Sequence, residues 1–177
     1  MGKLFQTLEE RHIEFIRQQP LFFVATAPKE GRINLSPKGL DALRVIDDQH
    51  ILWLNLTGSG NETAAHLLED SRMTLMFCSF GEKPLILRTY GRATALHPDD
   101  DAWSDPSPHF AENIGARQII SLTIELIHTS CGFGVPRMTF DGHRELLDQW
   151  IEKKGEQGIR DYWEEKNRIS LDGNPTR

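Results

Sequence analysis

Short apolar segments separated by turn residues fill the chain between residues 21 and 130, and this pattern constrains the fold more than any other feature. The first strand pair is predicted from LFFVATA and RINLS with PKEG between them, and the second from ALRVI and ILWLNL with DDQH between them. Segments at spacings of roughly 8–12 residues with turn signals between them indicate an antiparallel barrel or sandwich and disfavour a βαβ fold. The unbroken apolar run in ILWLNL predicts a strand that is buried on both faces.

The second half of this region predicts three further strands. RMTLMFCSF and LILRTYGRATAL are joined by the turn GEKP, and Gly91 within the second segment predicts a bulge or a close backbone approach. A long strand follows in QIISLTIELIHT, where we expect Ile120, Leu122, Ile124 and Leu126 to share one buried face. The apolar faces of ILWLNL and RMTLMFCSF are expected to leave a patch on an isolated barrel that a second subunit covers.

Helices are predicted at both ends of the β region and once inside it. Residues 7–18 form an amphipathic helix behind a Thr7-x-x-Glu10 capping box, and Ser59-x-x-Glu62 begins a short inner helix over 61–70. Two helices are expected within about 141–167, because a helical apolar period returns there and is interrupted by glycines.

The length and charge of the chain limit its organisation and partners. A chain of 177 residues predicts a single domain over 1–177, with the barrel at about 20–130 and a C-terminal helical extension at about 141–167. The net charge of −6 argues against a broad nucleic-acid face. No segment approaches the roughly 20 apolar residues of a membrane span, and no signal peptide is evident, so a cytoplasmic location is expected.

Catalytic and metal motifs are weak in this sequence. It contains no GxSxG, and its seven histidines lack HExxH or another short paired spacing, so no metal site is predicted. Cys131 is interpreted as a small buried residue before a glycine-rich turn, and the acidic run 99–101 as a solvated turn. We expect Arg72, Arg88 and Arg92 to face solvent from their strands.

Two neighbouring features favour binding of an anion. TGSGN lies between a predicted strand and a predicted helix, where free backbone N–H groups point toward a ligand, and Thr57, Ser59, Asn61 and Thr63 add polar side chains. Lys38 follows a predicted strand and a proline, so it can supply a fixed positive charge; the alternative is a solvated turn lysine. Together these features predict a phosphate site.

The order of FFVATAPKEGRINLSPKG, ILWLNLTGSGNETAAHLLEDSRMTLMF and LILRTYGRATAL resembles the split-barrel flavoproteins related to pyridoxamine 5′-phosphate oxidase, over about residues 10–130. The resemblance implies a mainly β fold, an antiparallel split β-barrel with an N-terminal helix, one inner helix and C-terminal helices. It also implies a homodimer with FMN at the subunit interface. The segments that bind the cofactor in that family contain Ser36, Lys38, Thr57, Ser59, Asn61 and Thr63 here.

The sequence departs from the vitamin B6 oxidases at two places. Those enzymes resemble each other in a Ser-Arg-Lys triplet at the helix start, where this chain has Gly60-Asn61-Glu62 and therefore lacks two phosphate cations. The chain also ends in helices and EEKNRISLDGNP, without their C-terminal arginine and histidine. We therefore expect an FMN-dependent oxidoreductase that acts on another small molecule.

Several alternatives remain open from the sequence. The chain could be a flavin-binding module without turnover, or a split-barrel haem protein with His66, His97 or His128 as axial ligand. Residues 131–136, CGFGVP, either abut the isoalloxazine ring or form a turn. Trp150 and Trp163 either cover an open barrel end or wall the flavin pocket.

Overall fold

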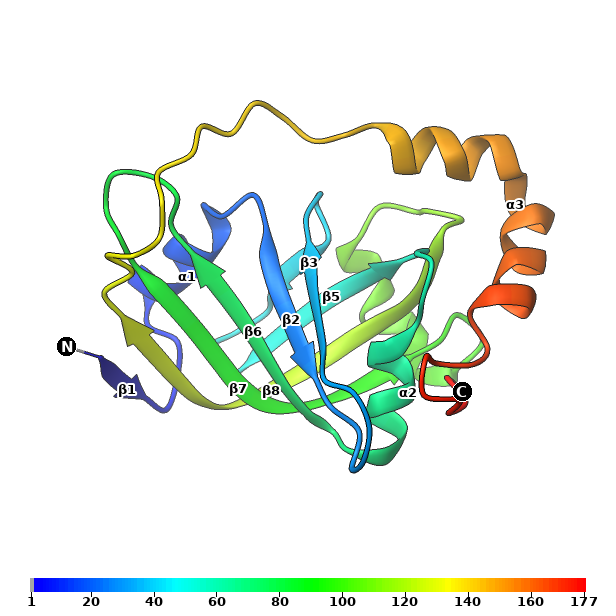
Figure 1. Cartoon of the computed structure of the whole chain (residues 1–177), viewed down its shortest axis with the longest axis horizontal. Helices are drawn as coiled ribbons and strands as arrows, with labels where there is room; N and C mark the ends of the chain where they lie inside the picture. Colours follow the sequence, from blue (N-terminus) through cyan, green and yellow to red (C-terminus); the bar gives the residue numbers. More distant parts are fainter. Residues whose placement is uncertain (1) are drawn as a thin grey trace.

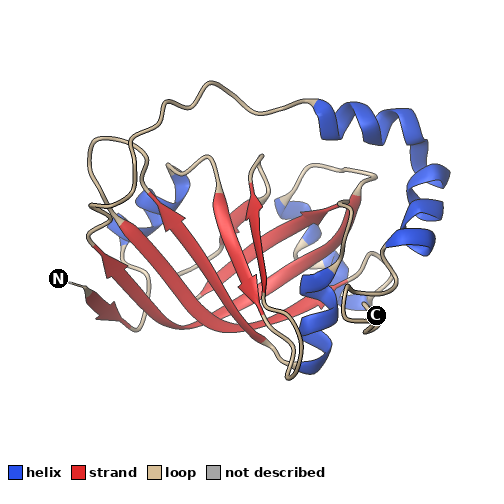
Figure 2. Cartoon of the chain, in the orientation of Figure 1, coloured by secondary structure: helices blue, strands red, loops and turns tan. Residues whose placement is uncertain are grey.

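A curved antiparallel sheet of eight strands forms the centre of the molecule (Figures 1 and 2). The structure, a computed structural model, describes residues 2–177. The strands are β1 (Lys3–Phe5), β2 (Phe22–Thr26), β3 (Asn34–Lys38), β4 (Leu43–Val45), β5 (His50–Leu56), β6 (Arg72–Cys78), β7 (Ile86–Leu96) and β8 (Ala116–Ser130). Their order is β3-β2-β6-β7-β8-β5-β4, with β1 added beside β8. The predicted antiparallel split barrel is confirmed, except that the three-residue β1 carried no alternation by which it could be predicted.

The helices lie where they were predicted: α1 (Glu10–Arg17), α2 (Glu62–Glu69) and α3 (Leu146–Lys166). The two predicted capping boxes are wrong. The N-cap of α1 is Glu9, whose N–H donates to His12 Nδ1 at 3.1 Å, so the helix begins later than Thr7 would place it. The N-cap of α2 is Asn61, and the Glu62 carboxylate instead accepts from the N–H of Leu171.

Strand β5 is buried on both faces, as its apolar run predicted. Trp53 lies edge-on to Phe22 at 6.2 Å on the inner face, while Leu52 and Leu54 on the opposite face are also buried. The loop that carries the short 3-10 helices η1 (Asp101–Ser104) and η2 (Ser107–His109) packs apolar side chains against this core. The prediction that ILWLNL exposes an apolar face is therefore wrong, because the η1–η2 loop of the same chain covers that face.

Strands β7 and β8 pair along most of their length around one irregularity. The register shifts between Tyr90 and Gly91, and a Cβ built on Gly91 would lie 2.0 Å from the carbonyl oxygen of Thr123. The close approach predicted for Gly91 is confirmed. The shift also changes which side chains are buried on β8, so Ile127 is buried and Leu126 only half-buried, against the prediction.

The C-terminal part of the chain passes over the sheet and returns to α2. Residues 131–145 cross above the strands as a loop, and α3 then bends at Gly155, where φ is 65° (Figure 1). Because this bend separates two helical segments, the prediction of two C-terminal helices is confirmed. No helix among the residues that the structure describes is long and apolar enough to cross a membrane.

The end of β8 differs from its prediction at one residue. Cys131, predicted to be buried, is exposed, because β8 ends at Ser130 and the chain continues as a loop. Gly132 beside it is buried against Leu85 and has a left-handed conformation with φ of 66°. The N–H of Val135 donates to the Gly132 carbonyl at 2.9 Å, so CGFGVP contains a turn.

The acidic run at 99–101 is only partly a solvated turn, since Asp99 and Asp100 pair with Arg177.

Candidate functional site

Arg117, at the start of β8, is a buried cation that is held only by neutral groups. It is 5% exposed, and its Nε has no hydrogen-bond partner. Its Nη atoms donate to Gly60 O and Asn167 Oδ1 at 2.8 Å, to Leu56 O at 3.1 Å and to Asn55 Oδ1 at 3.4 Å. Burial lowers the pKa of Arg117 to about 10, so the guanidinium stays charged at neutral pH.

Lys38 is a second desolvated cation near Arg117. The alternation of β3 places it on the inner face, where its Nζ lies 5.0 Å from the centroid of the Trp53 ring. Burial, with the charge of Arg117 adding to it, lowers the pKa of Lys38 from 10.5 to about 8. Within residues 2–177 no carboxylate forms an ion pair with either cation. A bound anion would relieve the cost of both charges.

The turn between β5 and α2 contacts Arg117 through the carbonyl of Gly60, and two of its side chains are buried nearby. Thr57 Oγ1 donates to Gly115 O at 2.7 Å and accepts from Trp163 Nε1 at 2.8 Å. Asn61 is buried and donates weakly to the carbonyl of Asn167 at 3.4 Å, while its Oδ1 has no partner. The structure thus brings Thr57 and Asn61 into the surroundings of Arg117.

Of the other residues predicted for the site, Ser36 and Thr63 lie apart from Arg117, whereas Ser59 belongs to this turn. Ser36 donates to Asn34 Oδ1 at 3.0 Å, and Asn34 Nδ2 donates to Thr63 Oγ1 at 3.4 Å, which links β3 to α2. Ser59 is exposed. The predicted residues therefore form two groups, one around Asn34 and one around Arg117, and Lys38 is electrostatically coupled to the second.

A cavity of about 970 Å³ lies between the η1–η2 loop, the start of β8 and the second half of α3. Apolar and aromatic walls come from Leu54, Trp103, Phe110, Ile119 and Trp163. Asn61 and Arg117 also line the cavity, and each has one buried side-chain atom without a hydrogen-bond partner. Its other arginines are paired: Arg160 with Glu156, Arg168 with Glu164 and Arg177 with Asp99. The volume is at the upper end of the range for small-molecule sites, and Arg117 is its uncompensated cation.

The tryptophans of α3 have different roles. Trp163 lines the cavity and contacts Thr57, so it walls the pocket. Trp150 is half-buried and lies edge-on to Tyr162, with ring centroids 5.0 Å apart, across the bend in α3.

The candidate haem ligands lie in three separate places. His66 is buried on α2, with Nδ1 3.0 Å from Thr26 Oγ1. His97 lies beside Asp100 at 3.5 Å, and burial lowers its pKa. His128 lies on β8 where β1 pairs with it. In the described part of the chain, His, Cys, Asp and Glu side chains form no cluster of three that could hold a metal ion.

The three arginines expected on strand surfaces behave in two ways. Arg72 and Arg92 are exposed and pair with Asp70 and Glu125, as predicted. Arg88 is half-buried and donates to Ser130 Oγ at 3.3 Å, so it is not fully solvent-facing.

The family model for pyridoxamine 5′-phosphate oxidase matches residues 8–131 of the chain. The chain belongs to this family. A curated family member, the pyridoxamine 5′-phosphate oxidase family protein ustO from Aspergillus flavus, is 34% identical over 193 residues, covering 99% of this chain and 78% of that protein. The family model itself covers β2 to β8, including Arg117, and its match ends before α3 and Asn167.

Solved structures of two proteins show the same fold. HupZ from Group A Streptococcus superposes with a TM-score of 0.55 at 19% identity, covering 69% of this chain and 98% of that chain. A putative pyridoxamine 5′-phosphate oxidase from Lactobacillus delbrueckii gives a TM-score of 0.55 at 22% identity, with coverages of 70% and 94%. The family resemblance seen in the sequence is therefore confirmed.

Sequence reasoning missed Arg117 and Asn167. Arg117 and Gln118 directly precede the apolar run IISL, and a charged residue next to a buried strand was the available signal. Asn167 carried no comparable signal, because it lies after a helix and 50 residues from the arginine that it contacts.

Proposed function

We propose that this chain binds FMN and acts as a flavin-dependent oxidoreductase on a small molecule. The observation that carries the proposal is the pair of desolvated cations, Lys38 and Arg117, which lack carboxylate partners within residues 2–177. A phosphate monoester carries about −1.5 to −2 charges at neutral pH, which matches two such cations. Family membership supports the flavin, because the resembled flavoproteins bind FMN through the same segments of the barrel.

In this proposal the phosphate lies near Lys38, Arg117 and the first N–H groups of α2. Arg117 supplies from β8 the positive charge that Gly60-Asn61-Glu62 lacks at the helix start. The carboxylate of Glu62 is held toward the C-terminal segment by the N–H of Leu171, at 3.0 and 3.1 Å. Neutral donors for the phosphate or the ribityl chain come from the remaining predicted ligands, Ser36, Thr57, Ser59, Asn61 and Thr63.

The cavity next to Arg117 gives the substrate a place beside the cofactor. Its aromatic walls suit a flat organic molecule, and the flavin would supply the redox chemistry when bound. The protein residues would bind and orient the two molecules and limit access of water. This division explains why no acid–base pair is evident in the sequence.

We also propose a homodimer with the flavin at the interface. Strand β3 is an edge of the sheet, where Leu35 is 63% exposed and Ile33, just before the strand, is 78% exposed; in the 131–145 loop Phe133 is 81% exposed. A second copy would cover such side chains. Sedimentation at decreasing protein concentration, with flavin fluorescence followed in parallel, tests this: a monomer that keeps FMN at full affinity would contradict the shared site.

The cofactor and the activity are tested by the spectrum of the purified protein loaded with FMN and by its reduction with a nicotinamide donor. We expect a flavin spectrum that bleaches with the donor and returns when an acceptor is added. A bound flavin that the donor does not reduce would favour a non-catalytic flavin-binding module. A haem spectrum, with no flavin uptake, would contradict the proposal.

A further inference from the structure

We infer that the C-terminal segment, residues 167–177, is part of the phosphate site, and that Asn167 is a positioning residue for Arg117. The inference rests on the proposed function. This segment lies outside residues 8–131, the part of the chain that the family model matches. Two sets of contacts support it, one at Asn167 and one along the rest of the segment.

Asn167 is 3% exposed and joins three parts of the site. Its Oδ1 accepts from Arg117 at 2.8 Å, and its Nδ2 donates to Gly58 O at 3.1 Å. Its backbone carbonyl accepts from Thr176 Oγ1 at 2.6 Å and from Asn61 Nδ2 at 3.4 Å. Through its side chain and its backbone carbonyl, Asn167 therefore fixes the guanidinium, the β5–α2 turn and the end of the chain relative to one another.

The amide matters because it is neutral. It satisfies one N–H of Arg117 and leaves the positive charge uncompensated, whereas a carboxylate at the same position would cancel that charge. A site with two uncompensated cations discriminates in favour of a phosphate monoester dianion over a neutral ligand. Asn167 thus keeps Arg117 in place and available for an anion.

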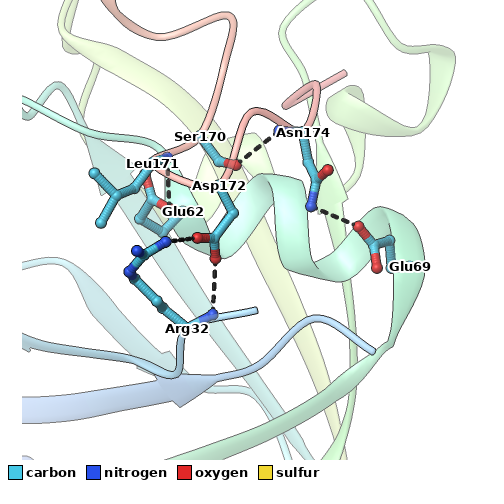
Figure 3. A network of polar contacts seen from close by, with 7 residues as sticks. All are labelled: Arg32, Glu62, Glu69, Ser170, Leu171, Asp172 and Asn174. Atoms are coloured by element: carbon cyan, nitrogen blue, oxygen red, sulfur yellow. Dashed lines mark hydrogen bonds and ion pairs between the residues drawn. The ribbon is translucent and has the colours of Figure 1, made fainter. Parts of the chain in front are cut away.

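The rest of the segment is clamped onto α2 and onto the β2–β3 turn (Figure 3). Asp172 pairs with the side chain of Arg32 and accepts from its N–H at 2.7 Å. The N–H of Leu171 donates to Glu62, and Asn174 Nδ2 donates to Glu69 at 2.8 Å, so both ends of α2 are held. These contacts fix Asn167 before any ligand binds, which reduces the entropy lost on binding.

The test compares Asn167→Asp with Asn113→Asp in titrations with FMN and riboflavin, followed by flavin fluorescence. Asn113→Asp introduces the same charge in a nearby loop, where its Oδ1 can still accept from the N–H of Gly115. We expect Asn167→Asp to weaken FMN by about tenfold or more, the size of a lost charge-assisted contact, with riboflavin within about twofold. The Asn113→Asp variant should keep the wild-type ratio of the two dissociation constants.

A purely structural role predicts an equal loss of both flavins in Asn167→Asp, and this result would overturn the inference. An unchanged FMN affinity in that variant, with the wild type preferring FMN, would overturn the inference and leave the proposed function standing. A wild type that binds both flavins equally would overturn the phosphate site itself, and the inference with it.

If Asn167→Asp does not fold, the same two titrations are made with Thr176→Val. It removes the hydroxyl bonded to the Asn167 carbonyl without changing a charge. We expect a loss of about twofold to fivefold for FMN alone, because the Asn167 backbone becomes less constrained. An equal change for both flavins, or no change for either, would overturn the inference.

Discussion

The surface charges around α2 and the two desolvated cations, Lys38 and Arg117, differ in their partners. In the clamp of Figure 3, Arg32 has Asp172, while Glu62 and Glu69 accept from N–H groups of the C-terminal segment. Arg117 beneath the β5–α2 turn and Lys38 at the end of β3 are desolvated instead, and no carboxylate within residues 2–177 pairs with either. Paired surface charges orient a segment at little gain in stability, whereas uncompensated buried cations cost stability and therefore indicate a ligand.

The largest effect is expected from removing the buried guanidinium. Arg117→Met should weaken FMN by about 100-fold or more, because a charge-assisted phosphate contact is worth about 1.5–3 kcal/mol and the turn also loses its anchor at Gly60. Fluorescence titration at pH 7 measures it, with circular dichroism to verify folding. A folded variant with FMN affinity within twofold of wild type would remove Arg117 from the site.

A smaller loss is expected at Lys38. Lys38→Ala should weaken FMN by about tenfold, whereas Arg92→Ala should leave it unchanged, since a solvated ion pair is worth about 1 kcal/mol or less and does not contact the ligand. Arg92 is the matched control because its side chain is 61% exposed and pairs with Glu125. Equal affinities for the Lys38 variant and the wild type would show that Lys38 takes no part in binding.

The lowered pKa of Lys38 predicts a dependence on pH. FMN affinity should fall as the pH rises from 7 to 9, because Lys38, with a pKa of about 8, loses its proton while the phosphate stays dianionic. In the ligand-free protein the unfolded chain binds more protons between pH 8 and 10.5, so this residue makes stability rise with pH there and adds no slope below pH 8.

Urea unfolding of the ligand-free protein between pH 7 and 10.5 measures this predicted rise in stability, with Lys38→Met as the comparison. The variant should be more stable than wild type at pH 7 and should lack the rise above pH 8. An FMN affinity that does not change between pH 7 and 9 would contradict a role for the Lys38 charge.

The smallest effect is expected in the clamp. Asp172→Asn should lower the free energy of unfolding only slightly in a urea titration at pH 7, because Arg32 is solvated and the amide can still accept from its N–H. The ratio of FMN to riboflavin affinity should fall by less than about twofold, because Asn167 keeps its own contacts with Arg117 and Thr176. A tenfold fall in FMN affinity would show that the two regions are more strongly coupled than their contacts indicate.

The fold could be predicted from the sequence because it depends on local periodicity. The strand pairs, the doubly buried β5 and the close approach at Gly91 all follow from apolar patterns and turn residues. Leu126 was misplaced because the bulge that shifts β8 depends on its neighbour β7.

The site was harder to predict because its decisive contacts are distant in the sequence. Lys38 and the turn were visible as local features, but their partner Arg117 comes from another strand, and Asn167 from a segment after α3. The displaced capping of α2 has the same cause, since Glu62 is engaged by Leu171, which is 109 positions away.

The central claim is that phosphate recognition by uncompensated cations determines which flavin this protein binds. Titration of the ligand-free wild-type protein with FMN and with riboflavin at pH 7 tests it most directly. The two ligands differ by the phosphate group alone, so their affinity ratio measures the phosphate contribution. We predict that FMN binds at least about tenfold more tightly, as charge-assisted contacts require. Equal dissociation constants for the two flavins would contradict the account.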